Sequence, residues 1–396
     1  MTQPSYSNAE LQDGSAPRIN GARLLRDLDT FATFGARPDG GVDRVAGSEA
    51  DAAGRAWLVQ RIGEAGLRAE TDKIGNVFGR THTGTGPALL LGSHTDSVPA
   101  GGRLDGSYGV IAALETLRTL HEAGHPCADR VRIVGFWDEE GARPESAGGL
   151  TGSTAFVAGD RLRDVAAFFE LHVEQGPRME KAGSDLTVVQ GIVGIERHEI
   201  KLFGVPNHAG TTPMADRVDA GRAAAGLVTG LTSRLTAIDP ELVFNIGFIE
   251  FLPGAPNVVP GEARLTVEWR SGRSSVLRRA AGELAAEVRA AAAQEDCTAT
   301  IERLSHKAIT DFDGEACVAL ADACLKTGGV FGGSLLSFAG HDASVLSAHV
   351  PTSMLFVPST GGISHSPQES TPSHQLVIGC QALLHSVVGW YGRFYD

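Results

Sequence analysis

Acidic and imidazole side chains recur in five short motifs, which lie at the ends of predicted strands or at the start of a helix. The motifs are Gly-Ser-His94-Thr-Asp96, Gly-Arg-Leu-Asp105-Gly, Trp137-Asp138-Glu139-Glu140-Gly, Glu170-Leu-His172 and Gly362-Ile-Ser-His365-Ser. Imidazole and carboxylate groups together suit divalent transition metals. A single histidine at a strand end is more often a structural hydrogen-bonding residue, and adjacent glutamates are usually a solvated turn. Five such motifs at equivalent positions indicate a metal site.

The elements that must position these motifs alternate between strands and helices. Ser48 and Asp51 form a capping box, which predicts the start of a helix that Gly66 ends. Continuous apolar runs predict buried strands at 88–92, 131–137 and 165–171, and a helical stripe lies between them at 110–124. This order predicts an α/β layer with a mainly parallel sheet. In such sheets ligands bind beyond the carboxyl ends of the strands, where the motifs lie.

The middle of the chain follows a different pattern. Strands are predicted at 195–203, 243–250, 262–270 and 298–304, and helices at 217–235 and 274–293. This βαββαβ order is typical of a small split-βαβ domain. The α/β pattern then returns, with a helix at 315–326, a strand at 353–357 and a last helix from 374. We therefore expect a catalytic domain formed by residues 1–193 and 313–396, with a domain of residues 194–312 inserted in it.

Composition excludes several classes of protein. The 396 residues carry 34 Lys and Arg against 47 Asp and Glu, a formal net charge of −13. Such a surface repels nucleic acid and anionic membranes. Five scattered cysteines without C-x-x-C argue against a disulfide framework. Neither a signal peptide nor a membrane-spanning run is visible, so we expect a cytoplasmic location. G-x-S-x-G and Gly-Lys-Ser/Thr are absent, which disfavours a serine hydrolase and a P-loop enzyme.

An ordered set of longer segments resembles the hydantoinase/carbamoylase branch of the M20 metallopeptidase superfamily. The segments are GSHTDSVPAGGRLDGSYGV, DEEGARP, ELHVEQGP, GVPNHAGTTPMADRVDA, AGHDA and GGISHSPQE. That branch contains N-carbamoyl-L-amino-acid hydrolases, β-ureidopropionases, allantoate amidohydrolases and ureidoglycolate amidohydrolases. The resemblance spans about residues 24 to 389. It implies a dimetal α/β catalytic domain with an inserted lid domain that also forms a homodimer.

The resemblance also implies a set of metal ligands. His94 and His172 would bind one ion, and Glu140 and His365 would bind the other. Asp105 would bridge both ions. The ions would be zinc or manganese, and cobalt or nickel would also suit these ligands. Two such ions lower the pKa of a water molecule held between them.

Two further acidic residues receive catalytic roles from the resemblance. Glu139 would be the general base that takes a proton from water and delivers it to the leaving nitrogen. Asp96 would orient the imidazole of His94. The alternatives are a salt bridge for Glu139, a solvated turn for Asp96 and a helix-capping turn for Asp105.

Four residues match substrate-contacting positions of the family: Gln175, His208, Asn257 and Arg270. His208 and Asn257 would reach the site across domain closure or from a partner subunit. Arg270 would bind the substrate carboxylate, and with Asn257 it would line the same edge of the lid. The alternatives are that His208 caps a turn and that Arg270 is a surface charge. In the latter case Arg217 is the next candidate for the carboxylate.

Five positions depart from the usual family pattern: Leu104, Ser107, Asp138, Glu268 and Ser344. None of these removes a proposed metal ligand or the base. Ser107, Glu268 and Ser344 bear on the choice of substrate.

The resemblance predicts cleavage of the ureido C–N bond of an N-carbamoyl-L-amino acid or N-carbamoyl-β-alanine, to give the amino acid, carbon dioxide and ammonia. The alternative is hydrolysis of allantoate or ureidoglycolate. An aminoacylase or dipeptidase is disfavoured because the HVEQG segment is present. A binding protein on an inactive scaffold is disfavoured because all six ligand and base positions carry suitable side chains.

Overall fold

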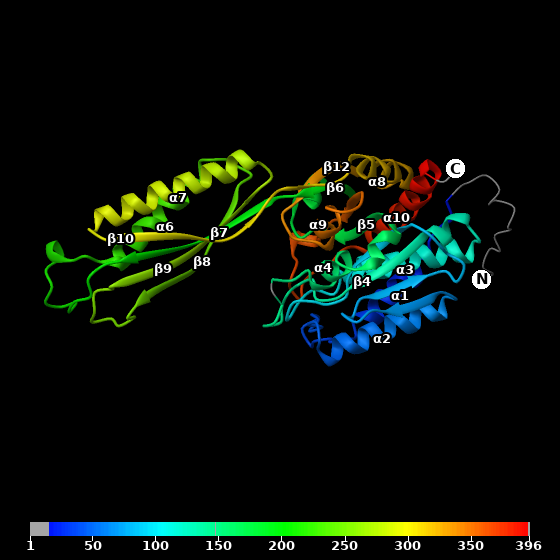
Figure 1. Cartoon of the computed structure of the whole chain (residues 1–396), viewed down its shortest axis with the longest axis horizontal. Helices are drawn as coiled ribbons and strands as arrows, with labels where there is room; N and C mark the ends of the chain where they lie inside the picture. Colours follow the sequence, from blue (N-terminus) through cyan, green and yellow to red (C-terminus); the bar gives the residue numbers. More distant parts are fainter. Residues whose placement is uncertain (1–15, 147, 395–396) are drawn as a thin grey trace. The chain divides into compact units, whose positions relative to one another are not determined.

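The chain forms two compact units, which are described separately. The structure is a computed structural model that describes residues 16–146 and 148–394. The first unit comprises Met1–Gly191 together with Asp311–Asp396, and the second comprises Ile192–Thr310. The colours of Figure 1 follow the sequence and show that the second unit, in green and yellow, is one continuous stretch of the chain. The residues before and after that stretch form the first unit.

The first unit is built on a mixed sheet with strand order β1-β2-β4-β3-β5-β13-β6-β11, in which β12 also pairs with β6. Its central strands β4, β3, β5 and β13 are mutually parallel. The strands are β1 (Arg68–Thr71), β2 (Val77–Arg80), β3 (Ala88–His94), β4 (Val131–Phe136), β5 (Val165–Val173), β6 (Leu186–Ile192), β11 (Thr310–Asp311), β12 (Phe331–Ser337) and β13 (Thr352–Val357). The predicted α/β class with a mainly parallel sheet is therefore confirmed.

Helices cover both faces of this sheet. One face packs against α1 (Gly21–Phe31), α2 (Glu49–Glu64), α3 (Ser107–Glu122), α8 (Gly314–Thr327) and α10 (Ser373–Phe394). The other face packs against the short helices α4 (Thr151–Val157) and α9 (Asp342–Leu346). Every residue of β3 and β13 is buried, as expected for strands covered on both faces. Within the described ranges, no helix is long and apolar enough to cross a membrane.

The N-cap at the start of α2 forms as the sequence predicts, but the reciprocal half of the capping box does not, because the Asp51 carboxylate accepts the N–H of Gly47 rather than that of Ser48. Ser48 is the N-cap residue, and its hydroxyl accepts a hydrogen bond from the backbone N–H of Asp51 at 3.1 Å. By contrast, β1, β2, α1, β6 and β12 were not expected. The first two are only four residues long, and β1 reads Arg-Ala-Glu-Thr, which has no apolar alternation. Strand β2 forms by pairing with β4, and β1 forms by pairing with β2, because neither strand has a sequence pattern of its own that would specify it.

A buried arginine joins the segments that lead to the carboxyl edge of the sheet. Arg44 is fully buried, and burial lowers its pKa to about 10. Its guanidinium donates hydrogen bonds to the main-chain oxygens of Thr95, Phe31 and Phe34 and to the hydroxyl of Ser107, at 2.6–3.1 Å. Thr95 follows β3 and Ser107 begins α3, so Arg44 fixes the end of a strand relative to the start of a helix.

The second unit is an antiparallel sheet of order β10-β7-β9-β8. The strands are β7 (Gly194–Phe203), β8 (Val243–Leu252), β9 (Glu262–Ser271) and β10 (Thr298–Lys307), and helices α6 (Ala220–Thr236) and α7 (Ser274–Gln294) pack on one face. The predicted βαββαβ order of elements is confirmed. Trp269 of β9 is fully buried in this core, whereas the edge strand β8 exposes Val243, Phe248, Ile249 and Phe251.

Replacing Arg44 by methionine is expected to destabilise the protein by at least about 3 kcal/mol, because several buried acceptors would lose their donor and each unsatisfied group costs about 1–3 kcal/mol. Urea-induced unfolding monitored by tryptophan fluorescence measures the change. The control is Arg103→Met, since Arg103 bonds to the exposed Asp29 and surface ion pairs contribute about 0–1 kcal/mol. Equal unfolding midpoints for the two variants would contradict a structural role of Arg44.

Candidate metal centre

The five motifs meet at the carboxyl edge of the parallel strands in the first unit. His94 is the last residue of β3, and Glu139 and Glu140 follow β4. His172 lies at the end of β5, and Asp105 lies two residues before α3. The last histidine, His365, follows the short 3-10 helix Thr360–Gly362 and has a positive φ of 52°. Chain segments far apart in the sequence are thus brought to one sheet edge, as the parallel topology requires.

The carboxylate of Asp105 lies at the centre of this group. Its Oδ1 is 3.4 Å from Nε2 of His94 and 3.1 Å from Nε2 of His172. Its Oδ2 is 3.0 Å from Nε2 of His365, and that same nitrogen is 3.4 Å from Oε2 of Glu140. Asp105 therefore directs one oxygen toward a pair of histidines and the other toward a histidine and a glutamate. The ligand atoms of each of these two groups lie within 4.8 Å of one another.

The ionisation of these side chains reflects how closely they are crowded. Burial opposes ionisation of Asp105, but hydrogen bonds with the three histidines lower its pKa well below the usual value. The hydrogen bond between His365 and Asp105 raises the pKa of His365 to about 9. Burial, followed by the charge of Asp105, raises the pKa of Glu140 to about 7. Burial also raises the pKa of Glu139 well above its usual value.

The residues present fit divalent cations. Oε1 of Glu140 is buried and has no hydrogen-bond partner in the described part of the chain. A buried carboxylate oxygen without a donor is costly, and a cation would satisfy it. The donor set of imidazoles and carboxylates is also the one that zinc and manganese accept. Nε2 of His94 lies 3.9 Å from Oε2 of Glu139, so the expected general base borders the same space.

Asp96 contacts both His94 and the loop that carries Glu139 and Glu140. Its carboxylate accepts the backbone N–H groups of Glu139 and Glu140 at 3.1 and 3.2 Å. Its Oδ1 is 3.6 Å from Nδ1 of His94, while the main-chain oxygen of Asp96 is 3.1 Å from that nitrogen. Asp96 thus orients His94 through its main chain and holds the glutamate loop through its side chain.

Glu369 positions the centre, although the sequence alone did not predict this role. Its Oε1 accepts the backbone N–H groups of Leu104 and Asp105 at 2.9 and 3.1 Å. Its Oε2 accepts the hydroxyl of Ser364 at 2.9 Å, next to His365. One buried carboxylate therefore ties the Asp105 segment to the His365 segment. The only signal in the sequence was its place at the end of the GGISHSPQE segment.

Three further buried groups border the centre and were also missed. The His341 ring lies 4.7 Å from the His172 ring, centroid to centroid, and Glu170, His172 and His341 form a third potential ligand group. Asp342 is fully buried, and burial and the charge of Glu170 raise its pKa to about 8. The AGHDA segment and the start of ELHVEQGP contain all of these residues. The sequence therefore indicates the motifs but not the roles of these individual side chains.

Of the four expected substrate contacts, only Gln175 lies in the first unit. Its amide nitrogen donates to Oδ2 of Asp105 at 3.0 Å and is 3.0 Å from Nε2 of His365. The structure thus brings Gln175 to the Asp105 group.

His208 and Asn257 are neighbours in the second unit. His208 pairs with Val258 in an isolated bridge, and the N–H of Ala209 donates to the main-chain oxygen of Asn257 at 2.9 Å. Arg217 holds this loop by donating to main-chain oxygens of Ala209 and Thr212.

The expectation that Asn257 and Arg270 line the same edge of this domain was wrong. Asn257 precedes β9, which begins at Glu262, whereas Arg270 is the penultimate residue of that strand. Eight residues of extended strand span roughly 26 Å. The two side chains therefore belong to opposite ends of the strand.

The departures from the family pattern have structural contacts. The hydroxyl of Ser107 accepts a hydrogen bond from Arg44, and Leu104 is buried in the core. The carboxylate of Asp138 accepts from Arg143, Ser146 and Thr151, and the hydroxyl of Ser344 donates to the main-chain oxygen of His341. The carboxylate of Glu268 accepts from Arg197 and Arg270.

Comparisons with known proteins define the family. Residues 90–388 match Peptidase family M20/M25/M40. The allantoate amidohydrolase of Bacillus subtilis is 32% identical over 390 residues, covering 90% of this chain and 94% of that protein. The N-carbamoyl-L-amino-acid amidohydrolase of Rhizobium meliloti is 31% identical over 407 residues, covering 95% and 97%.

A solved structure supports the same family. The hydantoinase/carbamoylase family amidase from Burkholderia ambifaria superposes with a TM-score of 0.85 at 32% identity, covering 94% of this chain and 98% of that chain. The protein therefore belongs to Peptidase family M20/M25/M40, and it is a hydrolase.

Changing Asp105 to alanine should abolish tight binding of both ions. Each oxygen of Asp105 faces one group of ligands, and without the carboxylate charge two neighbouring cations would repel one another. Metal content after dialysis, measured by mass spectrometry, tests this. Asp160→Ala is the control, since the Asp160 side chain is 91% exposed. Retention of one ion at full occupancy in Asp105→Ala would show that this carboxylate is not shared.

Proposed function

We propose that the protein is a dimetal amidohydrolase that cleaves the ureido C–N bond of an N-carbamoyl-L-amino acid or N-carbamoyl-β-alanine, giving the amino acid, carbon dioxide and ammonia. The observation that carries this proposal is the division of the two Asp105 oxygens between two groups of ligands. The N-carbamoyl-L-amino-acid amidohydrolases among the relatives support the substrate class.

Five side chains would hold the ions. His94 and His172 face one position, Glu140 and His365 face the other, and Asp105 faces both. When bound, two divalent ions lower the pKa of water between them and polarise a carbonyl oxygen. Zinc and manganese both suit these ligands, as do cobalt and nickel.

Glu139 is the proton carrier in the proposed reaction. Its carboxylate borders the ligand group and belongs to the loop that Asp96 holds through two backbone N–H groups. Burial raises the pKa of this carboxylate well above its usual value, which makes it a stronger base than an exposed glutamate. Glu139 accepts a proton from the attacking water and donates it to the departing nitrogen as the C–N bond breaks.

Glu139→Gln is expected to retain both metals and to lose at least about 10²–10⁴-fold in kcat, since the amide cannot accept the proton. Metal content and ammonia release are measured on the same preparation. Glu145→Gln is the matched control, because Glu145 is an exposed residue shortly after the same motif. Normal turnover by a fully metal-loaded Glu139→Gln enzyme would disprove the proton-carrier role.

Allantoate or ureidoglycolate hydrolysis is the second candidate for the substrate. It is favoured by the relatives of Bacillus subtilis and Escherichia coli named allantoate amidohydrolase, which are as similar to this chain as the carbamoylases are. Ammonia release from a panel of carbamoyl-L-amino acids, carbamoyl-β-alanine, allantoate and ureidoglycolate separates the two candidates. The highest kcat/KM identifies the substrate class.

Arg270 is proposed to bind the substrate carboxylate. A planar guanidinium binds a carboxylate through two parallel hydrogen bonds, which an ammonium cannot reproduce. Glu268 accepts from Nε of Arg270 at 2.8 Å and from Arg197, so the orientation of the guanidinium is fixed within the second unit. This contact gives Glu268, two positions before Arg270, the role of orienting the guanidinium.

Arg270→Lys should leave metal content unchanged and lower kcat/KM by at least about tenfold, equivalent to about 1.4 kcal/mol. Arg264→Lys is a matched control on the same strand, since Arg264 bonds Glu262 as Arg270 bonds Glu268. If both variants hydrolyse carbamoyl amino acids as the wild type does, Arg270 is a surface charge. Arg217 would then be tested, although its guanidinium already holds two main-chain oxygens.

The protein is also proposed to be a homodimer through the second unit. Asn257 and Arg270 are at opposite ends of β9, so one copy of this unit cannot present both to the same small substrate. In a dimer, one copy of the chain would supply Arg270 and the other copy would supply Asn257. The edge strand β8 exposes Phe248, Ile249 and Phe251, which is unusual for an edge that remains in solvent.

Ile249→Lys combined with Phe251→Lys should convert the dimer to a monomer, because desolvating two ammonium groups opposes association. Light scattering during size-exclusion chromatography gives the mass. The control is Val318→Lys on α8, which is 52% exposed in the first unit. A wild-type mass equal to one chain would contradict the dimer.

A further inference from the structure

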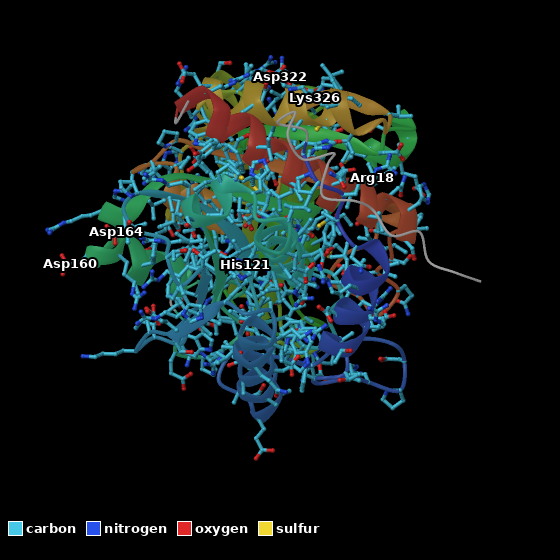
Figure 2. The ribbon with its side chains drawn as sticks, turned by 90° about the vertical axis from the view of Figure 1, so that its right-hand side faces the viewer. Arg18, His121, Asp160, Asp164, Asp322 and Lys326 are labelled. Atoms are coloured by element: carbon cyan, nitrogen blue, oxygen red, sulfur yellow. The ribbon has the colours of Figure 1, made fainter. Side chains whose placement is uncertain are left out.

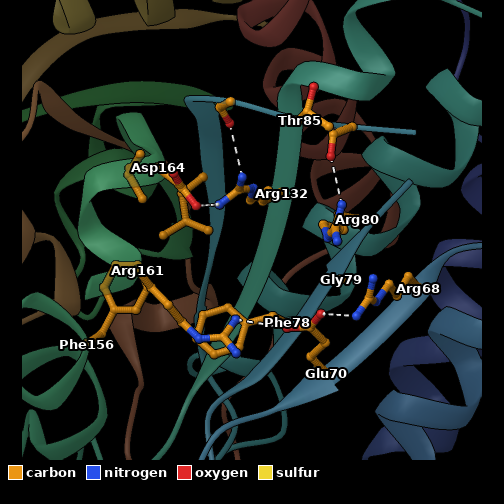
Figure 3. A pocket seen from close by; sticks show the side chains of 14 residues that line it. Arg68, Glu70, Phe78, Gly79, Arg80, Thr85, Arg132, Phe156, Arg161 and Asp164 are labelled. Carbon is orange, nitrogen blue, oxygen red and sulfur yellow. Dashed lines mark hydrogen bonds and ion pairs between the residues drawn. The ribbon is translucent and has the colours of Figure 1, made fainter. Parts of the chain in front are cut away.

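A cavity lies in the first unit, at the amino ends of β4 and β5 (Figure 3). Its volume is about 320 Å³, which is within the range of small-molecule sites. The metal ligands His94, Glu140 and His172 lie at or beyond the opposite, carboxyl ends of β3, β4 and β5. The cavity is therefore separate from the metal centre within the same unit.

Three arginines occupy one row across the sheet in this cavity. Arg68 of β1 is directly opposite Arg80 of β2, and Arg80 is directly opposite Arg132 of β4. Residues paired in this way lie on the same face of a sheet, and like charges directly opposite each other are destabilising. Stability of the sheet alone does not explain this row.

The cavity carries an excess of positive charge in an acidic protein. Its lining contains four arginines (Arg68, Arg80, Arg132 and Arg161) and two carboxylates (Glu70 and Asp164), a formal excess of two positive charges against −13 for the whole chain. Both carboxylates are paired with arginines: Glu70 bonds Arg68 at 3.0 Å and Arg161 at 3.1 Å, and Asp164 bonds Arg132 at 3.4 Å.

Local hydrogen bonds point the arginines in fixed directions. Nη1 of Arg80 donates to the main-chain oxygen of Gly84 at 2.7 Å, and Nη2 of Arg132 donates to that of Gly86 at 3.0 Å. Both acceptors are neutral carbonyls, so these contacts orient the guanidinium groups without neutralising them. Dashed lines in Figure 3 trace the contacts of the lining residues.

The same cavity has an apolar side. Phe78 of β2 and Phe156 of α4 line it, with ring centroids 5.7 Å apart. The guanidinium of Arg161 lies 4.8 Å from the centre of the Phe78 ring. Asp160 and Asp164, at the two ends of the 3-10 helix that carries Arg161, lie at the rim of the first unit in Figure 2. The cavity therefore opens at the surface and combines cations with aromatic carbon.

We propose that this cavity is a binding site for a small organic dianion, a phosphate monoester or a dicarboxylate with an apolar body. The two negative charges match the excess of two positive charges, and the guanidinium groups of Arg80 and Arg132 supply planar donors that suit phosphate or carboxylate oxygens. The apolar body packs on Phe78 and Phe156.

Titration calorimetry of the metal-loaded enzyme tests the proposal, with phenyl phosphate, phthalate and inorganic phosphate as probes. We expect saturable binding of phenyl phosphate or phthalate that Arg80→Gln and Arg68→Gln each weaken by at least about tenfold, with ammonia-releasing activity retained. The stronger of the two probes identifies the anionic group. Arg163→Gln is the matched control, because the Arg163 side chain is 82% exposed and does not line the cavity.

Two results would overturn the proposal. One is the absence of saturable binding of either aromatic dianion to the wild type. The other is equal affinity in wild type, Arg80→Gln and Arg68→Gln, which would place the anion elsewhere, for example at the metal centre. Binding of inorganic phosphate as tightly as phenyl phosphate would disprove the apolar part of the proposal. Two arginine variants are used so that misfolding of one leaves the other as a test.

Discussion

The geometry of the centre depends on one carboxylate, that of Asp105. Its two oxygens lie within 3.4 Å of three histidine nitrogens that come from different segments of the chain. A buried carboxylate in contact with three imidazoles requires each segment to be held accurately, because small displacements would separate the two groups of ligands. Several features of the first unit serve this requirement.

Three side chains hold the segments around Asp105. Glu369 accepts the N–H of Asp105 and the hydroxyl next to His365, and Asp96 accepts two N–H groups of the glutamate loop. Arg44 joins the end of β3 to the start of α3 from within the core. These contacts are charge-assisted and buried, so they are stronger than ordinary hydrogen bonds. Rigid positioning of this kind is what a pair of cation sites needs.

Much of this arrangement could be predicted from the sequence. The apolar runs before His94 and Trp137 identified buried strands, and the parallel α/β class then placed their carboxyl ends together. The short strands β1 and β2 were not predictable, because partner strands rather than their own pattern form them. Glu369 and Arg44 were missed because their partners are main-chain groups distant in sequence. The error over Asn257 and Arg270 arose because a separation of 13 residues seemed short, although an extended strand lies between them.

The most direct test of the shared carboxylate is electron paramagnetic resonance of the manganese-loaded enzyme. Two ions that share Asp105 would lie about 3.5–4 Å apart and would interact magnetically. We expect two manganese ions per chain and an exchange-coupled spectrum with closely spaced hyperfine lines. A six-line spectrum of isolated ions at full loading, or saturation at one ion per chain, would contradict a centre built on one shared carboxylate.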